Sequence, residues 1–535
     1  WWRGTRVIDT LVDGQSLDYT ITEFPAFSFL LGDLHPHVMS LPFVVLGLSL
    51  GLNLFQYRST IGPGWLLRNP LEAIAIALFV GSLAFINIWD LPLLAGIFAV
   101  LILVKNYGEG DGDLQRAVLN AAAALIPILA LGVLMFLPFY LTFSGGALGI
   151  LPLQDVSTRP ILFFLAIGLF ALLAISFLLL QLPGLGRPTR PDGVFAGLVL
   201  AIALMPLVVW GGIVLVLTWA DEGVGAAIVD VGGRALWVLP GLAIVAVASI
   251  SAGMRLRRGE ETAAAFPLML VAVAFYLLVG AELFYVNDTF GGAFRRMNTV
   301  FKVYYQSWLL LGLAGTYALY FWRSRVTTHS LRGSEPRQPE PGAGHTHSQQ
   351  KLVRTANWVW GFAVVLMVVG SAYYSVGAVL DRTGILNQNH TLADNTLDGL
   401  SFVQSQDPGE YAAILWLRDD AGFGRIVEAV GDDYSDYGRI SASTGFPTLL
   451  GWKGHELQWR GTSLPFQGRE EDVERIYESS DPAEVKLLLE QYQVRYVYLG
   501  RRERSDYGGA NLAGFGNLLR TAFEQDGVII YELLN

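Results

Sequence analysis

The stretch PILFFLAIGLFALLAISFLLLQL, residues 160–182, decides the fold class of this chain. It contains no Asp, Glu, Lys, Arg or His. A helix needs about 20 mostly apolar residues to cross roughly 30 Å of hydrocarbon, so this segment predicts a transmembrane helix. Nine further segments have the same character, or nearly so: 39–57, 70–88, 91–106, 117–141, 194–219, 235–253, 265–285, 303–322 and 356–378. We therefore expect an all-α polytopic membrane domain of about ten helices.

The overall composition supports the same class. Of the 535 residues, 53% are hydrophobic and only 15% are charged, whereas soluble domains carry about 25% charged residues. The net charge of −10 argues against a nucleic-acid partner, which would favour a basic surface. The chain has no Cys, which excludes disulfides, thiolate metal sites and Cys nucleophiles.

The C-terminal part of the chain has a different pattern. Residues 379–535 alternate between helical and strand-like pieces, which predicts a small soluble α/β domain. We expect helices at 411–418 and 471–493, and strands at 425–430, 494–499 and 528–533.

The distribution of Lys and Arg predicts which side each loop faces. Alternate loops carry fifteen and seven of these residues, and the richer set should face the cytoplasm. This places the N-terminal loop, residues 1–38, outside the cell together with the loop at 286–302 and the C-terminal domain. Helices one to nine then span 39–322, residues 323–355 form a flexible cytoplasmic linker, and 356–378 form the last helix. We expect a multi-pass protein of the cell membrane whose active face is extracytoplasmic.

The first polar cluster lies in the N-terminal loop, where Glu23 is followed by Gly-Asp-Leu-His-Pro-His at 32–37. Pro36 favours extended backbone before it, and side chains alternate in an extended chain, so Asp33, His35 and His37 should share one face. A carboxylate and two imidazoles could hold a divalent metal such as Mg²⁺ or Mn²⁺, or supply an oriented base. The alternative is a polar loop that anchors the chain at the membrane interface.

The second polar cluster surrounds the start of the ninth segment. A helix that begins near Arg295 would place Arg295, Asn298, Lys302 and Gln306 on one face. Cations are scarce on the external side, so such a group suggests an anionic ligand such as phosphate. Headgroup contact or pairing with nearby acids is the alternative. The members of the cluster are Glu282, Asp288, Arg295, Arg296, Asn298 and Lys302.

Two weaker candidates lie elsewhere. Asp90 follows Trp89 at a hairpin tip, where it could belong to a site or cap the next helix. In the soluble domain, residues 451–460 are dense in aromatic and charged groups and include His455 and Glu456. Aromatic faces flanked by hydrogen-bonding groups suit sugars, although Trp in a small domain is more often core.

Several of these motifs resemble one known family. They are Glu-Phe-Pro at 23–25, Gly-Asp-Leu-His-Pro-His at 32–37, Asn-x-Trp-Asp at 87–90, Arg-Met-Asn-Thr-Val-Phe-Lys at 296–302, Thr-Gly-Phe-Pro-Thr at 444–448 and Gly-Trp-x-Gly-His-Glu at 451–456. Together they resemble the YYY-domain family of uncharacterised prokaryotic membrane proteins, from Arg6 to about Tyr531. The tyrosines that give the family its name lie upstream. Since the chain opens with Trp1 rather than Met, we expect it to be a fragment or a processed product.

The YYY proteins are in turn similar to C-type glycosyltransferases, integral enzymes that use sugars carried on polyprenyl phosphate. This resemblance implies an inverting sugar transfer at the outer leaflet, from a polyprenyl-phosphate donor to an unknown acceptor. Glu23 or Asp33 would act as general base, and Asp33, His35 and His37 would bind the metal. The loop lacks the Asp-x-Asp pair of the best-known members. The implied substrate-binding residues are Arg295, Arg296, Asn298, Lys302, Glu282, Asp288, Asp90, His455 and Glu456.

Two other functions remain open. A transporter or lipid flippase would need a polar track through the bilayer or an internal repeat, and the middles of the ten segments contain no ionisable residue. A non-catalytic membrane assembly protein would tolerate alanine at the polar positions.

Overall fold

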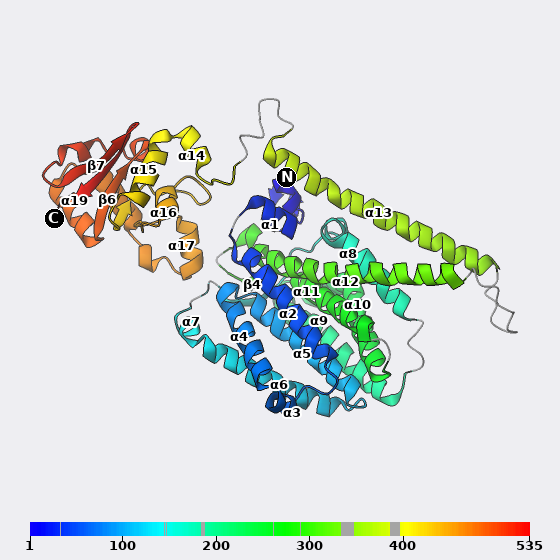
Figure 1. Cartoon of the computed structure of the whole chain (residues 1–535). Coiled ribbons are helices and arrows are strands. Elements are labelled where there is room, and N and C mark those ends of the chain that lie inside the picture. Colours follow the sequence, from blue (N-terminus) through cyan, green and yellow to red (C-terminus); the bar gives the residue numbers. More distant parts are fainter. Residues whose placement is uncertain are drawn as a thin grey trace. The chain divides into compact units, whose positions relative to one another are not determined.

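The computed structural model describes residues 1–32, 34–143, 145, 147–182, 188–259, 262–288, 290–332, 347–385 and 396–534. The chain divides into two compact units. The first comprises Trp1–Phe143 and Leu148–Gly384, and the second comprises Ser144–Ala147 and Ile385–Asn535 (Figure 1). Each unit has its own hydrophobic core, so the two are described separately.

The first unit is a bundle of helices. Each of the ten predicted segments lies mostly within one helix, which confirms a polytopic helical membrane domain. Among the described residues, eight helices are long and apolar enough to cross a membrane, and α4 is a shorter apolar helix. Helix α12 is not among the eight. The helices of this unit are α1 (Pro25–Leu31), α2 (Pro36–Gln56), α3 (Pro63–Arg68), α4 (Pro70–Ile86), α5 (Asp90–Glu109), α6 (Leu114–Met135), α7 (Leu137–Thr142), α8 (Pro160–Gln181), α9 (Arg190–Glu222), α10 (Val224–Arg257), α11 (Thr262–Leu283), α12 (Met297–Arg332) and α13 (His347–Thr383).

Proline determines where many of these helices begin. Helices α1, α2, α3, α4 and α8 each have a proline as their first residue. The first position of a helix has no intrahelical partner for its N–H, and proline presets the helical φ there. The spans therefore begin at residues that the sequence marks clearly.

The predicted linker at 323–355 is only partly a linker. Helix α12 continues to Arg332 and α13 already begins at His347, so both ends of that range are helical. Residues 333–346, with His345 among them, lie outside the described residues.

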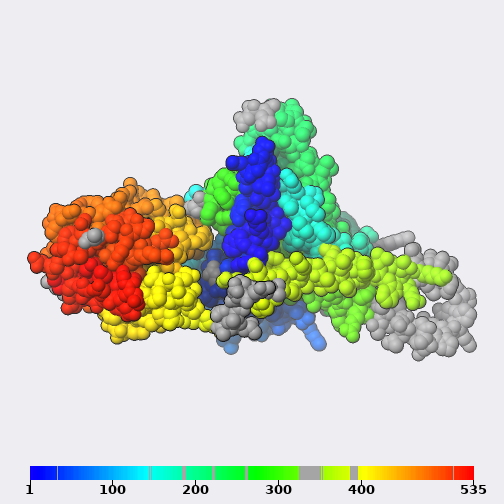
Figure 2. Space-filling model, turned by 90° about the horizontal axis from the view of Figure 1, so that it is seen from above, coloured from blue at the N-terminus to red at the C-terminus, as the bar shows by residue number. Residues whose placement is uncertain are grey.

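One end of the bundle, which we call the polar end, is where α2, α5, α8 and α12 begin and α4 and α11 end. The N-terminal residues lie at this end, with a short hairpin of β1 (Leu11–Val12) and β2 (Gln15–Ser16). Here β3 (Gly149–Pro152) pairs antiparallel with β4 (Phe284–Asn287). The Tyr374 hydroxyl of α13 donates to the Trp1 carbonyl at 3.0 Å. Figure 2 shows the N-terminal residues in blue beside α13 in yellow-green.

The second unit is a small α/β fold, as the sequence predicts. Its sheet has the order β5-β6-β8-β7, in which β5 and β6 are parallel and the other neighbours are antiparallel. The predicted helix at 471–493 is two helices, because the chain turns before Pro482. The strand β7 was not predicted. The elements are α14 (Ser401–Gln406), α15 (Pro408–Asp419), β5 (Arg425–Val427), α16 (Arg439–Thr444), α17 (Lys453–Arg460), α18 (Arg469–Glu478), α19 (Pro482–Gln491), β6 (Val494–Leu499), α20 (Arg501–Asp506), β7 (Leu519–Gln525) and β8 (Val528–Leu533).

Candidate functional site

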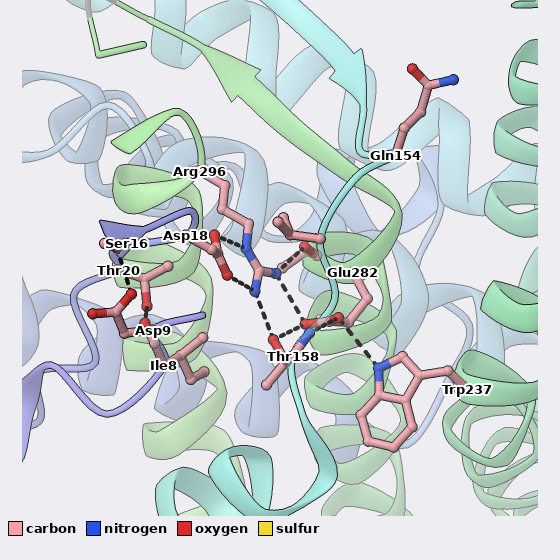
Figure 3. Close-up of polar contacts among 12 residues, drawn as sticks. Ile8, Asp9, Ser16, Asp18, Thr20, Gln154, Thr158, Trp237, Glu282 and Arg296 are labelled. Carbon is pink, nitrogen blue, oxygen red and sulfur yellow. Dashed lines mark hydrogen bonds and ion pairs between the residues drawn. The ribbon is translucent and has the colours of Figure 1, made fainter. Parts of the chain in front are cut away.

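The centre of the polar end is the guanidinium of Arg296, which is fully buried just before α12. It forms two parallel hydrogen bonds to Asp18, with Nε–Oδ1 at 2.7 Å and Nη2–Oδ2 at 2.6 Å. It also donates to Glu282 at 3.2 Å and to the Thr158 hydroxyl at 2.9 Å. Figure 3 shows Arg296 between Asp18 on one side and Thr158 and Glu282 on the other. Planar two-point pairing of this kind gives both strength and fixed geometry.

Glu282, at the end of α11, extends this buried network toward α10. Its carboxylate accepts the Thr158 N–H at 3.0 Å and the Trp237 indole N–H at 3.3 Å. The Arg234 guanidinium donates to the Glu282 carbonyl at 3.0 Å and to the carbonyls of Gln154 and Val156. The network therefore joins α10, α11, the start of α12 and the segment before α8.

Arg295 and Asn298 face a different part of the polar end. The Arg295 guanidinium lies 2.9 Å from Asp155, whose side chain is 70% exposed. The Asn298 amide donates to Asp288 at 2.8 Å. Helix α12 begins at Met297 rather than at Arg295. Arg295 precedes the helix and pairs with Asp155, while Asn298 pairs with Asp288, so these two members of the expected face contact different carboxylates.

Glu23 lies in a second buried group. The Arg6 guanidinium is 3.1 Å from its Oε1, and Nε2 of His37 is 3.8 Å from its Oε2. All three side chains are buried. His37 Nε2 also lies 3.3 Å from the Ser28 hydroxyl, which in turn accepts from Tyr305. The Arg6 guanidinium is therefore the charge partner of this buried carboxylate.

The two histidines lie together, but not for the reason that the sequence suggested. His35 has extended backbone, whereas His37 already lies in the first turn of α2, because Pro36 starts that helix. The expectation of an extended chain through His37 is therefore wrong. The imidazole rings nevertheless meet edge to face with centroids 4.7 Å apart, and the ring of Phe301 lies 4.6 Å from that of His37.

Lys302 links this group to the start of α5. Its ammonium lies 4.2 Å from the centre of the Phe301 ring, and the carboxylates of Asp90 and Glu23 are its electrostatic partners. Asp90 is buried and accepts hydrogen bonds from Asn87 at 2.9 Å and from Gln306 at 2.7 Å. Gln306 thus contacts Asp90 directly, and Lys302, one turn earlier in α12, interacts electrostatically with the same carboxylate.

Two cavities open at the polar end. The smaller, of about 60 Å³, combines Thr22 and Glu23 with apolar residues of α8 and α12, among them Ala166 and Trp308. The larger, of about 230 Å³, lies between α9, α10 and the loop before α8, and Trp210, Trp237, Arg234, Asp155 and Asp230 line it. The first cavity therefore brings a carboxylate next to apolar helix faces.

The expected metal site has no complete ligand set within the described residues. Within the described residues, no group of three or more His, Asp or Glu side chains could hold a metal ion. His35 and His37 are adjacent, whereas Asp33 lies outside the described residues. The metal site with Asp33, His35 and His37 therefore stays a prediction.

His455 and Glu456 belong to the second unit. The His455 Nδ1 lies 3.6 Å from Asp433, and the rings of Tyr434 and Trp452 lie against the imidazole. Glu456 pairs with Arg460 one turn later in α17. These residues form a surface of their own.

Several important residues of the polar end were not predicted. Asp18, Arg6 and Thr158 lie in loops without a recognisable motif. Arg234 contributes to the prediction only as one of the loop Lys and Arg residues that indicate orientation. Their partners lie far away in sequence, since Asp18 and Arg296 are 278 residues apart. The only available signal was an ionisable residue next to an apolar segment.

Comparison with known proteins adds a family match. Residues 1–311 match the family described as "Uncharacterized membrane protein (DUF2298)". The match includes the two buried networks around Arg296 and Glu23 but stops short of Tyr531, the expected limit. The match confirms that the chain belongs to an uncharacterised membrane family, as the motifs suggested. A search of curated proteins finds no match.

Proposed function

The chain belongs to the DUF2298 family of uncharacterized membrane proteins, whose description states no activity, and we propose a function from the contacts at its polar end. The proposed reaction is transfer of a sugar from a polyprenyl-phosphate donor to an acceptor. The observation that carries the proposal is the surroundings of Glu23. Glu23 lines a cavity together with its neighbours in the N-terminal segment and mostly apolar residues of α8 and α12. A donor with a lipid tail and a polar head needs both kinds of surface at one place.

The reaction requires a base and a group that stabilises the leaving phosphate. The acceptor oxygen bonds to the anomeric carbon, and the bond from that carbon to the phosphate oxygen breaks with its electron pair. Glu23 takes the acceptor proton, with His35 and His37 orienting it. Asp33, outside the described residues, is the second candidate for the base.

The departing polyprenyl phosphate carries the negative charge that the cations offset. Lys302 and Arg295 have this role in the proposal, since the Arg295 side chain is 25% exposed and that of Lys302 is half-buried. Arg296 has a different role. Its guanidinium is enclosed by Asp18, Glu282 and Thr158, so we assign it to positioning the start of α12.

The donor would reach the site from the bilayer, and the acceptor from the extracytoplasmic side. Asn298, Asp288 and Asp90 complete the polar surroundings of the cations. The 60 Å³ cavity is much smaller than the pockets of about 300–1,000 Å³ that hold small molecules, so binding requires α8 and α12 to move apart.

The test is transfer of labelled sugar from a polyprenyl-phosphate hexose by the chain in proteoliposomes, with a membrane extract as the source of acceptor. We expect release of free polyprenyl phosphate, and a loss of about 10²-fold or more in Glu23→Gln and Lys302→Ala. The matched controls Glu72→Gln and Lys351→Ala change exposed residues away from the polar end and should keep full activity.

Other outcomes would reject the proposal. Full activity in Glu23→Gln and in Asp33→Asn would exclude both carboxylates as base. Movement of the intact lipid-linked sugar between leaflets, without transfer, would identify a flippase instead. Thermal unfolding of each variant separates a lost reaction from a lost fold.

A further inference from the structure

Three rings form an exposed surface on the second unit, which we call the aromatic platform: Tyr434, Trp452 and His455. The Tyr434 and Trp452 ring centres are 5.6 Å apart, and the His455 ring lies 4.9 Å from Tyr434 and 5.1 Å from Trp452. Tyr434 is 82% exposed. The three residues come from the loop after β5 and from the start of α17.

The backbone of Tyr434 is strained. Its φ is +58°, in the left-handed region, where a side chain other than glycine costs roughly 1–2 kcal/mol. Burial of an aromatic ring could offset such a cost, but this ring is mostly in solvent. The ring nevertheless lies over Trp452 and His455, which makes it the most exposed member of the platform.

The platform is also held rigidly. The Trp452 indole donates to the Tyr437 carbonyl at 2.7 Å, and Asp433 accepts the Gly454 N–H at 3.1 Å. A Cβ at Gly454 would collide with the Asp433 carboxylate, and a Cβ at Gly431 with the Tyr437 ring. At both positions a larger residue would therefore displace a side chain of the loop. A preorganised surface loses little entropy when it binds a ligand.

Polar groups stand beside the rings. The Asp433 carboxylate lies 3.6 Å from the His455 Nδ1, which is itself buried and has no hydrogen-bond partner among the residues that the structure describes. Both side chains are about 30% exposed. The cations beside them are paired, Lys453 with Glu470 and Arg460 with Glu456. The surface therefore combines apolar ring faces with hydrogen-bonding groups, and its neighbouring cations are neutralised.

We propose that the aromatic platform is a carbohydrate-binding site that takes a pyranose ring of an oligosaccharide. The C–H face of the sugar packs on Tyr434 and Trp452, while its hydroxyls bond to Asp433 and His455. A membrane surface is the other candidate occupant. It would favour unpaired Lys and Arg for anionic headgroups, and here both cations are neutralised by glutamates.

This site is independent of the sugar transfer proposed for the first unit. Binding is measured without any polyprenyl-phosphate donor, so loss of one property does not imply loss of the other. A glycan bound here would be an acceptor if the first unit is a transferase, and a surface ligand if it is not.

The experiment uses the full chain in lipid nanodiscs and a panel of short soluble manno-, gluco-, galacto- and N-acetylglucosamine oligosaccharides. We expect saturable binding of at least one class. Tyr434→Gly should weaken it by about tenfold or more, since glycine accepts the left-handed backbone and removes only the ring. Trp452→Ala should act in the same direction. The control Trp459→Ala, an exposed tryptophan outside the platform, should bind as the unchanged chain does.

Two results would overturn the proposal. The first is no binding by any oligosaccharide of the panel, or equal binding by Tyr434→Gly. The second uses the absence of native cysteine, which makes the thiol of Tyr434→Cys unique for a fluorescent label. Quenching of that label by spin-labelled lipid headgroups, unaffected by oligosaccharide, would show that the platform contacts the membrane.

Discussion

Arg296 and Arg295 are neighbours in sequence, yet their surroundings differ greatly. Arg296 is fully buried and pairs with the fully buried Asp18, whereas Arg295 pairs with a largely exposed Asp155. Removing one partner of a buried pair leaves an uncompensated charge, while exposed pairs contribute little. The same residue type is thus part of a buried network at one position and of a largely exposed ion pair at the next.

The first prediction compares these two positions. Arg296→Gln should lower the free energy of unfolding by roughly 3–5 kcal/mol, because Asp18 and Glu282 lose their shared cation. Arg295→Gln should cost less than about 1 kcal/mol. Thermal unfolding in detergent measures both. Equal losses in the two variants would contradict the assignment of Arg296 to the buried network.

The second prediction concerns Tyr434. Tyr434→Gly should raise the stability of the second unit by about 1 kcal/mol, because the left-handed backbone favours glycine. A residue kept only for the fold would have the opposite effect. Tyr434→Ala is the control, since alanine removes the ring but keeps the strain. A stability loss in Tyr434→Gly, measured by thermal unfolding, would show that the ring is structural.

At the scale of single residues, the sequence predicted identities better than partners. The proximity of His35 and His37 follows from their short spacing, although Pro36 starts a helix there instead of an extended chain. The role of Arg296 does not, because it depends on Asp18 and Thr158, which are 278 and 138 residues away. Such contacts are set by how the helices pack, and no local pattern encodes them.

At the scale of elements, hydropathy and proline positions predict most helix starts. Hydropathy and proline positions do not show how the helices pack, and the interface of α4 and α6 is an example. A Cβ at Gly81 would collide with the Gly132 carbonyl, and a Cβ at Gly132 would come within 2.7 Å of the Ala77 carbonyl. Small residues let two membrane helices approach backbone to backbone. Which glycines serve this purpose cannot be read from the sequence alone, since many others face open space.

The third prediction tests this interface. Gly81→Ala and Gly132→Ala should each lower stability by roughly 1–3 kcal/mol, because the colliding atoms belong to the backbone and cannot move aside. Gly96→Ala and Gly280→Ala are matched controls in α5 and α11, where a Cβ meets nothing within 4 Å. Unfolding in detergent should show no loss for the controls. Equal effects at all four glycines would point to helix flexibility rather than close packing.

At the scale of the whole molecule, the shift in composition near residue 380 predicts the division into two units, which the contacts place at Gly384. The short segment Ser144–Ala147 is grouped with the second unit, and no sequence pattern indicates this. Because each unit has a separate core, a titrating group in one should affect the unfolding of that unit alone.

Glu503 provides such a group for the last prediction. Burial raises its pKa to about 7, although its carboxylate accepts the N–H groups of Ala429 and Gly500. A raised folded pKa means that the folded state binds the proton more tightly. Stability from this group is complete below the unfolded pKa of 4.5 and is lost as the pH rises through about 7. Burial also raises the pKa of Glu428.

We therefore expect the second unit to lose about 2 kcal/mol of stability between roughly pH 5.5 and 8. Glu532 does not titrate in this range. Burial raises its pKa, but Arg520 and Arg495 lower it further, so its contribution to stability disappears only in stronger acid. Hydrogen exchange of the β6 amides in the full chain measures the change. Glu503→Gln should flatten the profile, at the cost of one of the two N–H bonds, because the amide does not titrate. If the slope of stability against pH were unchanged in Glu503→Gln, the pH dependence would be assigned to Glu428 instead. If the exchange of the α11 amides changed equally with pH, the two units would not unfold independently.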